Sequence, residues 1–167
     1  MSQKRRVVIF GATGAIGAAL CQWFVAHEWQ VTAISRSTPN PAASADIEWL
    51  NWDPATSPSL PAGIHAPFDA LVWAQGMNLN DSIHDFNAAD HEQMYRANVI
   101  YIMQSLRALL DAKLLASPAR LCIISSIWQN ISRQNKLSYT VTKSAIQGLV
   151  NSLTIDLGQS GNLVNAV

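Results

Sequence analysis

Short continuous runs of apolar residues recur along the chain, separated by stretches with a helical period. Buried parallel strands have this character, being brief and rich in β-branched or aromatic side chains. The runs expected to form strands are Val7–Phe10, Val31–Ile34, Ile47–Trp52, Ala70–Ala74 and Leu121–Ile124, with the start of a sixth strand at Leu163–Val167. The pattern therefore predicts a sheet assembled from segments that are distant in sequence.

Three stretches between these strands predict helices. The first, Ala15–Glu28, directly follows a strand. The second, Asp90–Leu110, is preceded by Asn87, whose side chain is typical of an N-cap. The third, Ser138–Leu157, repeats apolar residues every four positions and so has one packing stripe, formed by Val141, Ala145, Leu149, Leu153 and Leu157.

The alternation of strands and helices predicts the fold class. Between Asp53 and Phe68 four prolines exclude a long helix, so that crossover is expected to be mostly loop. Elsewhere, right-handed crossovers build a parallel sheet with helices on both faces. We expect an α/β fold, a doubly wound parallel sheet in three layers (α/β/α), with functional residues at the carboxyl ends of the strands.

Composition limits the classes of partner. The 167 residues carry 11 Lys and Arg against 11 Asp and Glu, and only 13% are charged. Nucleic acids and anionic membranes attract proteins with a basic excess, so neither is expected as a partner. A 49% hydrophobic content is enough for one domain with a buried core. Cys21 and Cys122 lie far apart in apolar stretches and predict reduced core thiols rather than a disulfide.

The N-terminus superficially resembles a secretion signal, because Lys4, Arg5 and Arg6 precede an apolar run. Three glycines interrupt that run, and Leu20 before Cys21 is a poor cleavage position. We therefore expect a cytoplasmic protein. No other stretch approaches the roughly 20 apolar residues of a spanning helix, so no membrane association is expected.

The first chemical motif is Gly11-Ala12-Thr13-Gly14-Ala15-Ile16-Gly17, a turn from strand to helix with glycines three apart. A pyrophosphate needs backbone N–H groups at close range and the positive end of a helix, so side chains in such a turn are small or absent. The pattern favours nucleotide binding. The alternative is that the glycines only allow the helix to pack closely on the strand.

The second motif is Tyr139-Thr140-Val141-Thr142-Lys143, preceded by Ser126 at the end of a predicted strand. A tyrosine and a lysine four residues apart lie on one face of a helix, so the ammonium group can stabilise the phenolate and lower the pKa of the tyrosine. Tyr139 is then a candidate acid and base. A tyrosine and a lysine at this spacing occur by chance in many helices, so the pair taken alone is interpreted as a solvated helix face.

The order and spacing of six motifs resemble the short-chain dehydrogenase/reductase family, over essentially the whole chain. The motifs are Gly11-x-x-Gly14-x-x-Gly17, Asp69–Val72 before Gly76, Asn98 in the long helix, Ile123-Ile124-Ser125-Ser126, Tyr139-x-x-x-Lys143 and Asn162–Val167. The resemblance implies a single Rossmann-type NAD(P)-binding domain over residues 1–167. It also implies hydride transfer between a nicotinamide cofactor and a small-molecule carbonyl or alcohol.

The resemblance implies a role for each catalytic residue. Ser126, which stands 13 residues before Tyr139 at the usual family spacing, is expected to hydrogen-bond the substrate oxygen. Tyr139 passes that oxygen a proton, because hydride arriving at a carbonyl builds alkoxide charge. Lys143 is expected to bind the nicotinamide ribose and keep Tyr139 acidic, and Asn98 to hold a water linked to Lys143. Ser125, on the opposite face of the strand, is interpreted as structural.

The cofactor is expected to be NADP(H) rather than NAD(H). The second strand ends in Ile34-Ser35-Arg36 without an acidic residue, and an arginine there accommodates a 2′-phosphate. The alternative is that Arg36 is only a surface charge. Asp53 matches the family aspartate near the adenine. The expected cofactor-binding residues are Gly11, Thr13, Gly14, Ala15, Ile16, Gly17, Arg36, Asp53, Ala74, Gln75, Gly76, Tyr139 and Lys143.

Two of the chain's departures from the family pattern concern the cofactor and substrate sites. Ala74-Gln75-Gly76 stands where the family has Asn-Ala-Gly, and we expect cofactor binding to survive that change. Family members continue past the position of Val167 with a turn contacting the nicotinamide, a substrate lid and a further strand. We therefore expect the domain to be incomplete at its C-terminus, keeping the adenosine side of the cofactor site without useful turnover.

Several further expectations follow. Trp128 and Met77 are candidates for the substrate pocket, although tryptophans by default predict core packing. The histidines at positions 27, 65, 84 and 91 have no metal-ligand spacing, so no metal is expected. The family pairs its two long helices between subunits, which implies a homodimer or homotetramer here, with Ile100, Met103 and Ile146 covered. The competing function is a non-catalytic nucleotide-binding regulator or scaffold that keeps the fold.

Overall fold

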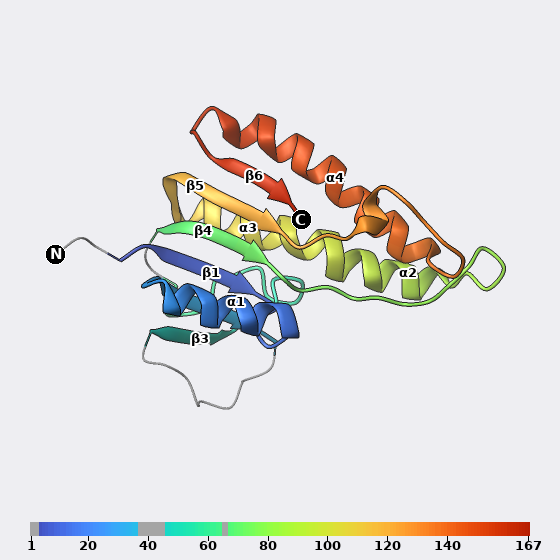
Figure 1. Cartoon of the computed structure of the whole chain (residues 1–167), viewed down its shortest axis with the longest axis horizontal. Coiled ribbons are helices and arrows are strands. Elements are labelled where there is room, and N and C mark those ends of the chain that lie inside the picture. Colours follow the sequence, from blue (N-terminus) through green and yellow to red (C-terminus); the bar gives the residue numbers. More distant parts are fainter. Residues whose placement is uncertain (1–3, 37–45, 65–66) are drawn as a thin grey trace.

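The structure is a computed structural model that describes residues 4–36, 46–64 and 67–167, and within them six strands form one parallel sheet (Figure 1). The strands are β1 (Arg6–Phe10), β2 (Gln30–Ser35), β3 (Ile47–Asn51), β4 (Phe68–Trp73), β5 (Leu115–Ile123) and β6 (Leu163–Ala166). Their order is β3-β2-β1-β4-β5-β6, and each neighbouring pair is parallel. The order reverses beside β1, and open α/β sheets bind ligands at such a reversal.

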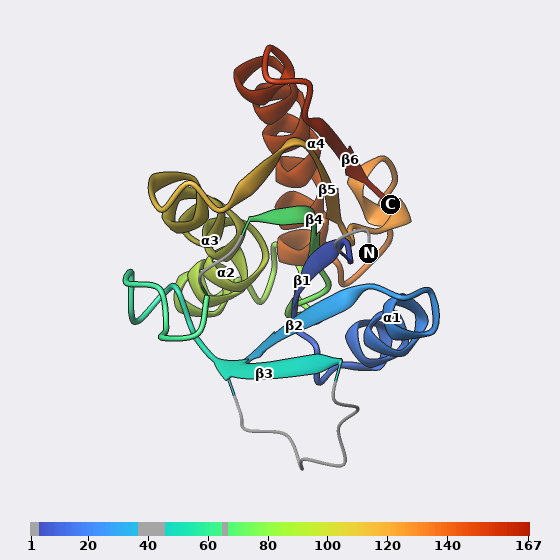
Figure 2. The ribbon, with the colours of Figure 1, turned by 90° about the vertical axis from the view of Figure 1, so that its left-hand side faces the viewer.

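Helices cover both faces of the sheet (Figure 2). On one face lies α1 (Ala15–Ala26), and on the other lie α2 (Ala88–Tyr95), α3 (Tyr101–Asp111) and α4 (Leu137–Gly158). Strand side chains alternate between the two resulting cores: Val7 and Ile9 of β1 pack with Cys21 of α1. Val8 and Phe10 pack into the core beneath α3 and α4. The predicted three-layer, doubly wound fold of Rossmann type is confirmed.

The predicted long helix Asp90–Leu110 is a composite of three segments. Asn87 caps it as expected, because its side chain accepts hydrogen bonds from the backbone N–H groups of Ala89 and Asp90. After α2 the backbone passes through a π-helical segment, Arg96–Ile100, before α3 begins. Apolar residues continue across this segment, so the sequence pattern did not reveal it. Such segments are frequent at functional sites.

Other element boundaries differ from the predicted ones for local reasons. β5 begins at Leu115, six residues before the predicted start at Leu121. The prediction started late because Ser117 and Pro118 interrupt the apolar pattern of the strand. α1 ends before Glu28, whose φ is +63°. The proline-rich crossover contains no helix in its described residues, 52–64 and 67, as predicted.

Burial corrects two expectations about apolar side chains. Trp52 and Trp73 lie in the core as expected, but Trp23 is 53% exposed and its ring stacks on His27. Ile146, expected at a subunit interface, is only 1% exposed and packs inside the chain's own core. Periodicity identifies residues that share a helix face, but the rotation of the helix on the sheet decides which face is buried.

The apolar stripe of α4 is confirmed in its second half. Leu149, Leu153 and Leu157 pack on the core beneath the sheet. Val141, at the start of the stripe, is exposed. The core therefore holds α4 mainly through its C-terminal half, together with Ile146.

The structure also shows the state of the cysteines and whether it has a membrane-spanning helix or a metal cluster. Cys21 and Cys122 are free thiols, as predicted, and burial raises the pKa of both. Among the described residues, no helix is long and apolar enough to cross a membrane. In the same ranges no three His, Cys, Asp or Glu residues come together as a metal site, and His65 lies outside the described residues.

Leu109 of α3 tests this description of the core, because it is fully buried against the sheet. Leu109→Ala leaves a cavity, so we expect the free energy of unfolding, measured by urea denaturation, to fall by about 2–5 kcal/mol. Ile155→Ala, at a position on α4 that is 77% exposed, is the matched control and should change it by less than about 0.5 kcal/mol. Equal losses in the two variants would contradict the assigned packing.

Candidate functional site

The turn from β1 to α1 brings backbone segments into close contact. Gly11 has a φ of +73°, and a Cβ atom on it would lie 2.6 Å from the backbone nitrogen of Gln75. A Cβ atom on Gly17 would lie 2.2 Å from the carbonyl oxygen of Gly11. Both positions therefore require glycine for the fold itself. Gly14 is different, because its nearest such contact is 3.4 Å away.

The N-terminus of α1 is open at this turn. Gly14 is the N-cap residue, and within the described ranges no side chain caps the helix. The first backbone N–H groups of a helix and its dipole together favour an anionic ligand. The N–H groups of Gly11 and Ala12 are already used, because both donate to the carbonyl oxygen of Ile34, at 3.0 and 3.1 Å. These two hydrogen bonds hold the turn against β2. The backbone N–H groups at the N-terminus of α1 are not involved in them.

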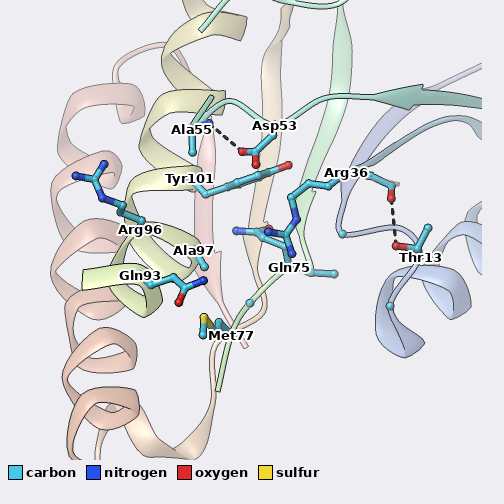
Figure 3. A pocket seen from close by; sticks show the side chains of 15 residues that line it. Thr13, Arg36, Asp53, Ala55, Gln75, Met77, Gln93, Arg96, Ala97 and Tyr101 are labelled. Atoms are coloured by element: carbon cyan, nitrogen blue, oxygen red, sulfur yellow. Dashed lines mark hydrogen bonds between the residues drawn. The ribbon is translucent and has the colours of Figure 1, made fainter. Parts of the chain in front are cut away.

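A cavity of about 850 Å³ adjoins the turn at the carboxyl ends of β1, β2 and β4 (Figure 3). The sequence predicted part of its lining: Gly11, Thr13, Gly14, Arg36, Asp53, Ala74, Gln75, Gly76 and Met77. The rest was missed: Ser35, Ala55, Gln93, Arg96, Ala97 and Tyr101. Three of the missed residues, Gln93, Ala97 and Tyr101, stand four positions apart, which is a signal for one shared helix face.

Five residues predicted to bind the cofactor do not line this cavity: Tyr139 and Lys143 of α4, and Ala15, Ile16 and Gly17. Ala15, Ile16 and Gly17 form the first turn of α1. The side chain of Ile16 is exposed, and Gly17 is buried against Gly11. Gly17 has no side chain, so any contact that it makes with a ligand is through the backbone. Met77, predicted for the substrate pocket, lines the same cavity instead.

The cavity wall carries polar groups without protein partners. Both amide atoms of Gln75 are buried and have no hydrogen-bond partner among the described residues. Unpaired buried polar atoms cost about 1–3 kcal/mol each unless a ligand or water pairs with them. Burial, and secondarily the carboxylate of Asp53, raises the pKa of Tyr101, so its phenol stays neutral. The side chain of Arg36 is exposed and lines the same cavity.

Asn98, in the π-helical segment, is buried and makes three side-chain hydrogen bonds. Its Oδ1 accepts from the backbone nitrogen of Met77 at 2.7 Å, and its Nδ2 donates to the carbonyl oxygen of Met77 at 2.9 Å. Nδ2 also donates to Oγ1 of Thr142 at 3.0 Å. Asn98 thus ties the segment after β4 to α4. The predicted binding of a water by Asn98 stays a prediction, and such a water must bind in addition to these three hydrogen bonds.

Lys143 and Tyr139 lie on one face of α4, as the spacing predicted. The ammonium group of Lys143 lies 5.6 Å from the centre of the Tyr139 ring and donates to the carbonyl oxygen of Ile124 at 3.1 Å. Lys143 is only 4% exposed, and burial lowers its pKa to about 8. A second ammonium group, that of Lys136, lies 5.5 Å from the same ring. Lys136 matches no motif in the sequence and was not predicted as a site residue.

The two serines after β5 differ in environment. Ser126 is half-buried, and among the described residues its Oγ accepts one long hydrogen bond, 3.4 Å, from the backbone nitrogen of Trp128. Ser125 is buried and its Oγ has no partner among the described residues. Ser126 therefore keeps hydrogen-bonding capacity for another molecule, in keeping with the role predicted for it. Trp128 is half-buried, and the guanidinium group of Arg133 lies 5.5 Å from the centre of its ring.

Gly76 lines the cavity and lies close to the ammonium group of Lys143. A Cβ atom on Gly76 would lie 3.2 Å from Oδ1 of Asn98 and 4.0 Å from Nζ of Lys143. Because Gly76 has no side chain, nothing from this position separates the cavity from the Lys143 ammonium group. The structure thus brings the glycine turn, the ends of β2 and β4, and the start of α4 to one edge of the sheet (Figure 1).

Comparisons with known proteins agree on one family. The family model for short chain dehydrogenases matches residues 62–167. Over 177 residues the chain is 25% identical to an uncharacterized oxidoreductase of Bacillus subtilis, YmfI, covering 98% of this chain and 73% of that relative. Over 182 residues it is 25% identical to 2-(R)-hydroxypropyl-CoM dehydrogenase of Xanthobacter autotrophicus, with 98% and 73% covered. The solved structure of ElxO with NADP bound shares the fold, with a TM-score of 0.85 at 20% identity, covering 98% of this chain and 72% of that chain.

Burial of Lys143 generates a prediction about stability and pH. The pKa of Lys143 is about 8 in the folded protein, against an ordinary value of 10.5. Between pH 8 and pH 10.5 the unfolded chain therefore binds more protons than the folded one. The free energy of unfolding rises with pH across this range. Between pH 7.5 and 9.5 we expect the wild type to gain roughly 1–2 kcal/mol relative to Lys143→Met, measured by urea denaturation.

The control for that measurement is Lys113→Met, because Lys113 is exposed. This variant should follow the wild-type pH dependence. If Lys143→Met also follows it, Lys143 is not desolvated and the assigned burial is wrong.

Proposed function

The chain belongs to the short chain dehydrogenase family, and on that premise we propose that it is an NADP(H)-dependent oxidoreductase that interconverts a carbonyl and an alcohol, with Tyr139 as general acid and base. One observation carries the proposal. The ammonium group of Lys143 lies beside the Tyr139 ring and, across the open position of Gly76, beside the cavity. A cofactor in the cavity and a proton donor on α4 can then act on the same substrate atom.

The residues of the cavity fit the adenosine and pyrophosphate parts of a dinucleotide. The uncapped N-terminus of α1 suits the pyrophosphate, and the close packing at Gly11 and Gly17 keeps the backbone free of side chains there. The unpaired amide of Gln75 offers a donor and an acceptor to a nucleotide. On this proposal the turn at Gly14 holds the phosphates, and Asp53 and Gln75 hold the adenosine.

The chain's own residues supply the proton chemistry of the proposal. A bound nicotinamide supplies or accepts the hydride. Tyr139 donates its phenol proton to the carbonyl oxygen as negative charge develops there, and Ser126 donates a hydrogen bond to the same oxygen. Lys143, with a pKa of about 8, is positively charged at neutral pH and stabilises the Tyr139 phenolate left behind. Alcohol oxidation is the same sequence in reverse.

Two observations on relatives are consistent with this reaction. The relative from Xanthobacter autotrophicus is named as a dehydrogenase of a hydroxypropyl group, which is alcohol chemistry. The ElxO structure holds NADP. In the present chain, Arg36 lines the cavity at the end of β2, where it can meet a 2′-phosphate.

Replacement of Tyr139 tests the reaction. In the full-length gene product, we expect Tyr139→Phe to lower kcat for NADPH-dependent carbonyl reduction by about 100-fold or more, because the proton donor is lost while the ring is kept. The dissociation constant for NADPH, measured by fluorescence titration, should change less than about twofold. Tyr95→Phe, on α2, is the matched control and should keep full activity. A Tyr139→Phe enzyme with wild-type kcat would contradict the proposal and favour the competing function, a non-catalytic nucleotide-binding regulator or scaffold.

Replacement of Arg36 tests the choice of cofactor. Charge-assisted hydrogen bonds contribute about 1.5–3 kcal/mol, so Arg36→Ser should weaken NADPH binding by roughly 10- to 100-fold and leave NADH binding nearly unchanged, as measured by calorimetry. Arg96→Gln should have a smaller effect, because Glu92 already holds the Arg96 guanidinium group at 2.8 Å. Tighter binding of NADH than of NADPH by the wild type would overturn the assignment.

A further inference from the structure

A second, smaller cavity lies on the Tyr139 side of the site. Its volume is about 460 Å³, and its lining residues are Asn80, Arg133, Gln134 and Asn135. We call it the Arg133 pocket. Asn80 comes from the segment that follows β4, and the other three residues precede α4. One wall of the pocket therefore comes from the segment that leaves the large cavity after β4. The other comes from the segment that leads into α4, the helix that carries Tyr139.

The Arg133 pocket is held next to Tyr139 by two contacts. Ser132, adjacent to Arg133, has its Oγ 3.0 Å from Oγ1 of Thr140, which follows Tyr139 in α4. On the other wall, Oδ1 of Asn80 accepts a 2.6 Å hydrogen bond from Nζ of Lys136, the group that also faces the Tyr139 ring. Both walls of the pocket are thus fastened to the first turn of α4.

The lining has the chemistry of an oxyanion site. It consists of one guanidinium group and three carboxamides, with no carboxylate and no aliphatic side chain. Across residues 4–36, 46–64 and 67–167, Arg133 has no ion pair, and its guanidinium group only faces the Trp128 ring. A guanidinium group presents paired N–H donors that match the two oxygens of a carboxylate or phosphate.

Lys136 adds positive charge beside the pocket. It is only 6% exposed, and its ammonium group is held by two neutral acceptors, Oδ1 of Asn78 at 2.8 Å and Oδ1 of Asn80 at 2.6 Å. Neither acceptor neutralises the charge. Because the Asn80 oxygen is bound to Lys136, the amide that Asn80 offers to the pocket is its Nδ2 donor group.

The nearby carboxylates are engaged elsewhere. Asp81 accepts hydrogen bonds from the backbone nitrogen and the hydroxyl group of Ser138, at the start of α4. Asp85 accepts from the backbone nitrogen and the hydroxyl group of Ser82, and these bonds lower its pKa. Neither carboxylate forms an ion pair with Arg133 or Lys136 in the described part of the chain, so both positive charges can still act on a ligand.

We propose that the Arg133 pocket binds an oxyanion, a carboxylate or a phosphate, carried by the substrate, so that the substrate class is a carbonyl compound or alcohol with an anionic group. The inference rests on the proposed function for the identity of the reacting group. Arg133 and Asn80 hold the anion, and the neighbouring carbonyl is then presented to Tyr139. The covalent chemistry is unchanged.

Paired substrates test the inference in the full-length gene product with NADPH. The acids 3-oxobutanoate, 4-oxopentanoate and 5-oxohexanoate are each compared with their methyl esters, and dihydroxyacetone phosphate with dihydroxyacetone. We expect at least one anionic member to exceed its neutral partner about tenfold or more in kcat/KM. Arg133→Ala should remove most of that advantage by raising the KM of the anionic member more than that of its neutral partner, whereas Arg133→Lys should keep part of it. The matched control is Arg107→Ala, at an exposed arginine of α3.

A binding measurement separates this inference from the proposed function. The side-chain Nε–H signal of Arg133, identified by its loss in Arg133→Ala, is followed by NMR while 4-oxopentanoate or dihydroxyacetone phosphate is added without cofactor. A saturable shift supports the pocket even if no turnover is seen, and the responding ligand tells carboxylate from phosphate. No shift, or an anion preference that survives Arg133→Ala, overturns the inference. Absence of NADPH binding or turnover counts against the proposed function alone.

Discussion

The side chain of Asn98 holds together parts of the chain that are far apart in sequence. Its hydrogen bonds to both backbone groups of Met77 fix the segment that leaves β4, and its bond to Thr142 fixes α4 one residue before Lys143. A buried carboxamide with four hydrogen-bonding positions can do this, and a buried amide left unpaired would be costly. The distance between the large cavity and the Tyr139–Lys143 pair is therefore set in part by this amide, together with the bonds from Lys136 to Asn80 and from Ser138 to Asp81. The π-helical segment that contains Asn98 is consistent with such a demand, since these segments are common at functional sites.

The second constraint is the absence of side chains where backbones meet. Gly11 and Gly17 are required by contacts within the protein, whereas Gly14 faces the open N-terminus of α1 and is free of such contacts. Gly76 has a third use, because it leaves space between the cavity and Lys143. One turn motif thus combines two needs, close packing of the helix on the sheet and access of a ligand to the backbone. The close-packing interpretation of the glycine motif is confirmed at Gly11 and Gly17, and the nucleotide-binding interpretation stays a prediction, centred on Gly14.

Positive charge is concentrated at the start of α4, where Lys136, Lys143 and Arg133 gather around Tyr139 and Trp128. The chain as a whole has no net charge, so this concentration is a local property. Lys143 matched a motif and was identified from the sequence. Lys136 and Arg133 matched none, because their importance comes from the side chains of Asn78, Asn80 and Trp128, which lie elsewhere in the chain. Spacing along one helix is readable from the sequence, and proximity between a loop and a helix is not.

The sequence alone determined the three-layer fold, the order of its strands and helices, and most of the glycine and strand-end residues that line the cavity. These features follow from local patterns: strand and helix periods, a cap at Asn87, and the need for glycine at a tight turn. Only the tertiary structure decided that Ile146 is core and Trp23 is exposed, that Gln93, Ala97 and Tyr101 form one wall of the cavity, and that Lys136 lies beside Tyr139. The physical reason is that each of these depends on how a helix is rotated and placed on the sheet, which is set by packing summed over many distant residues.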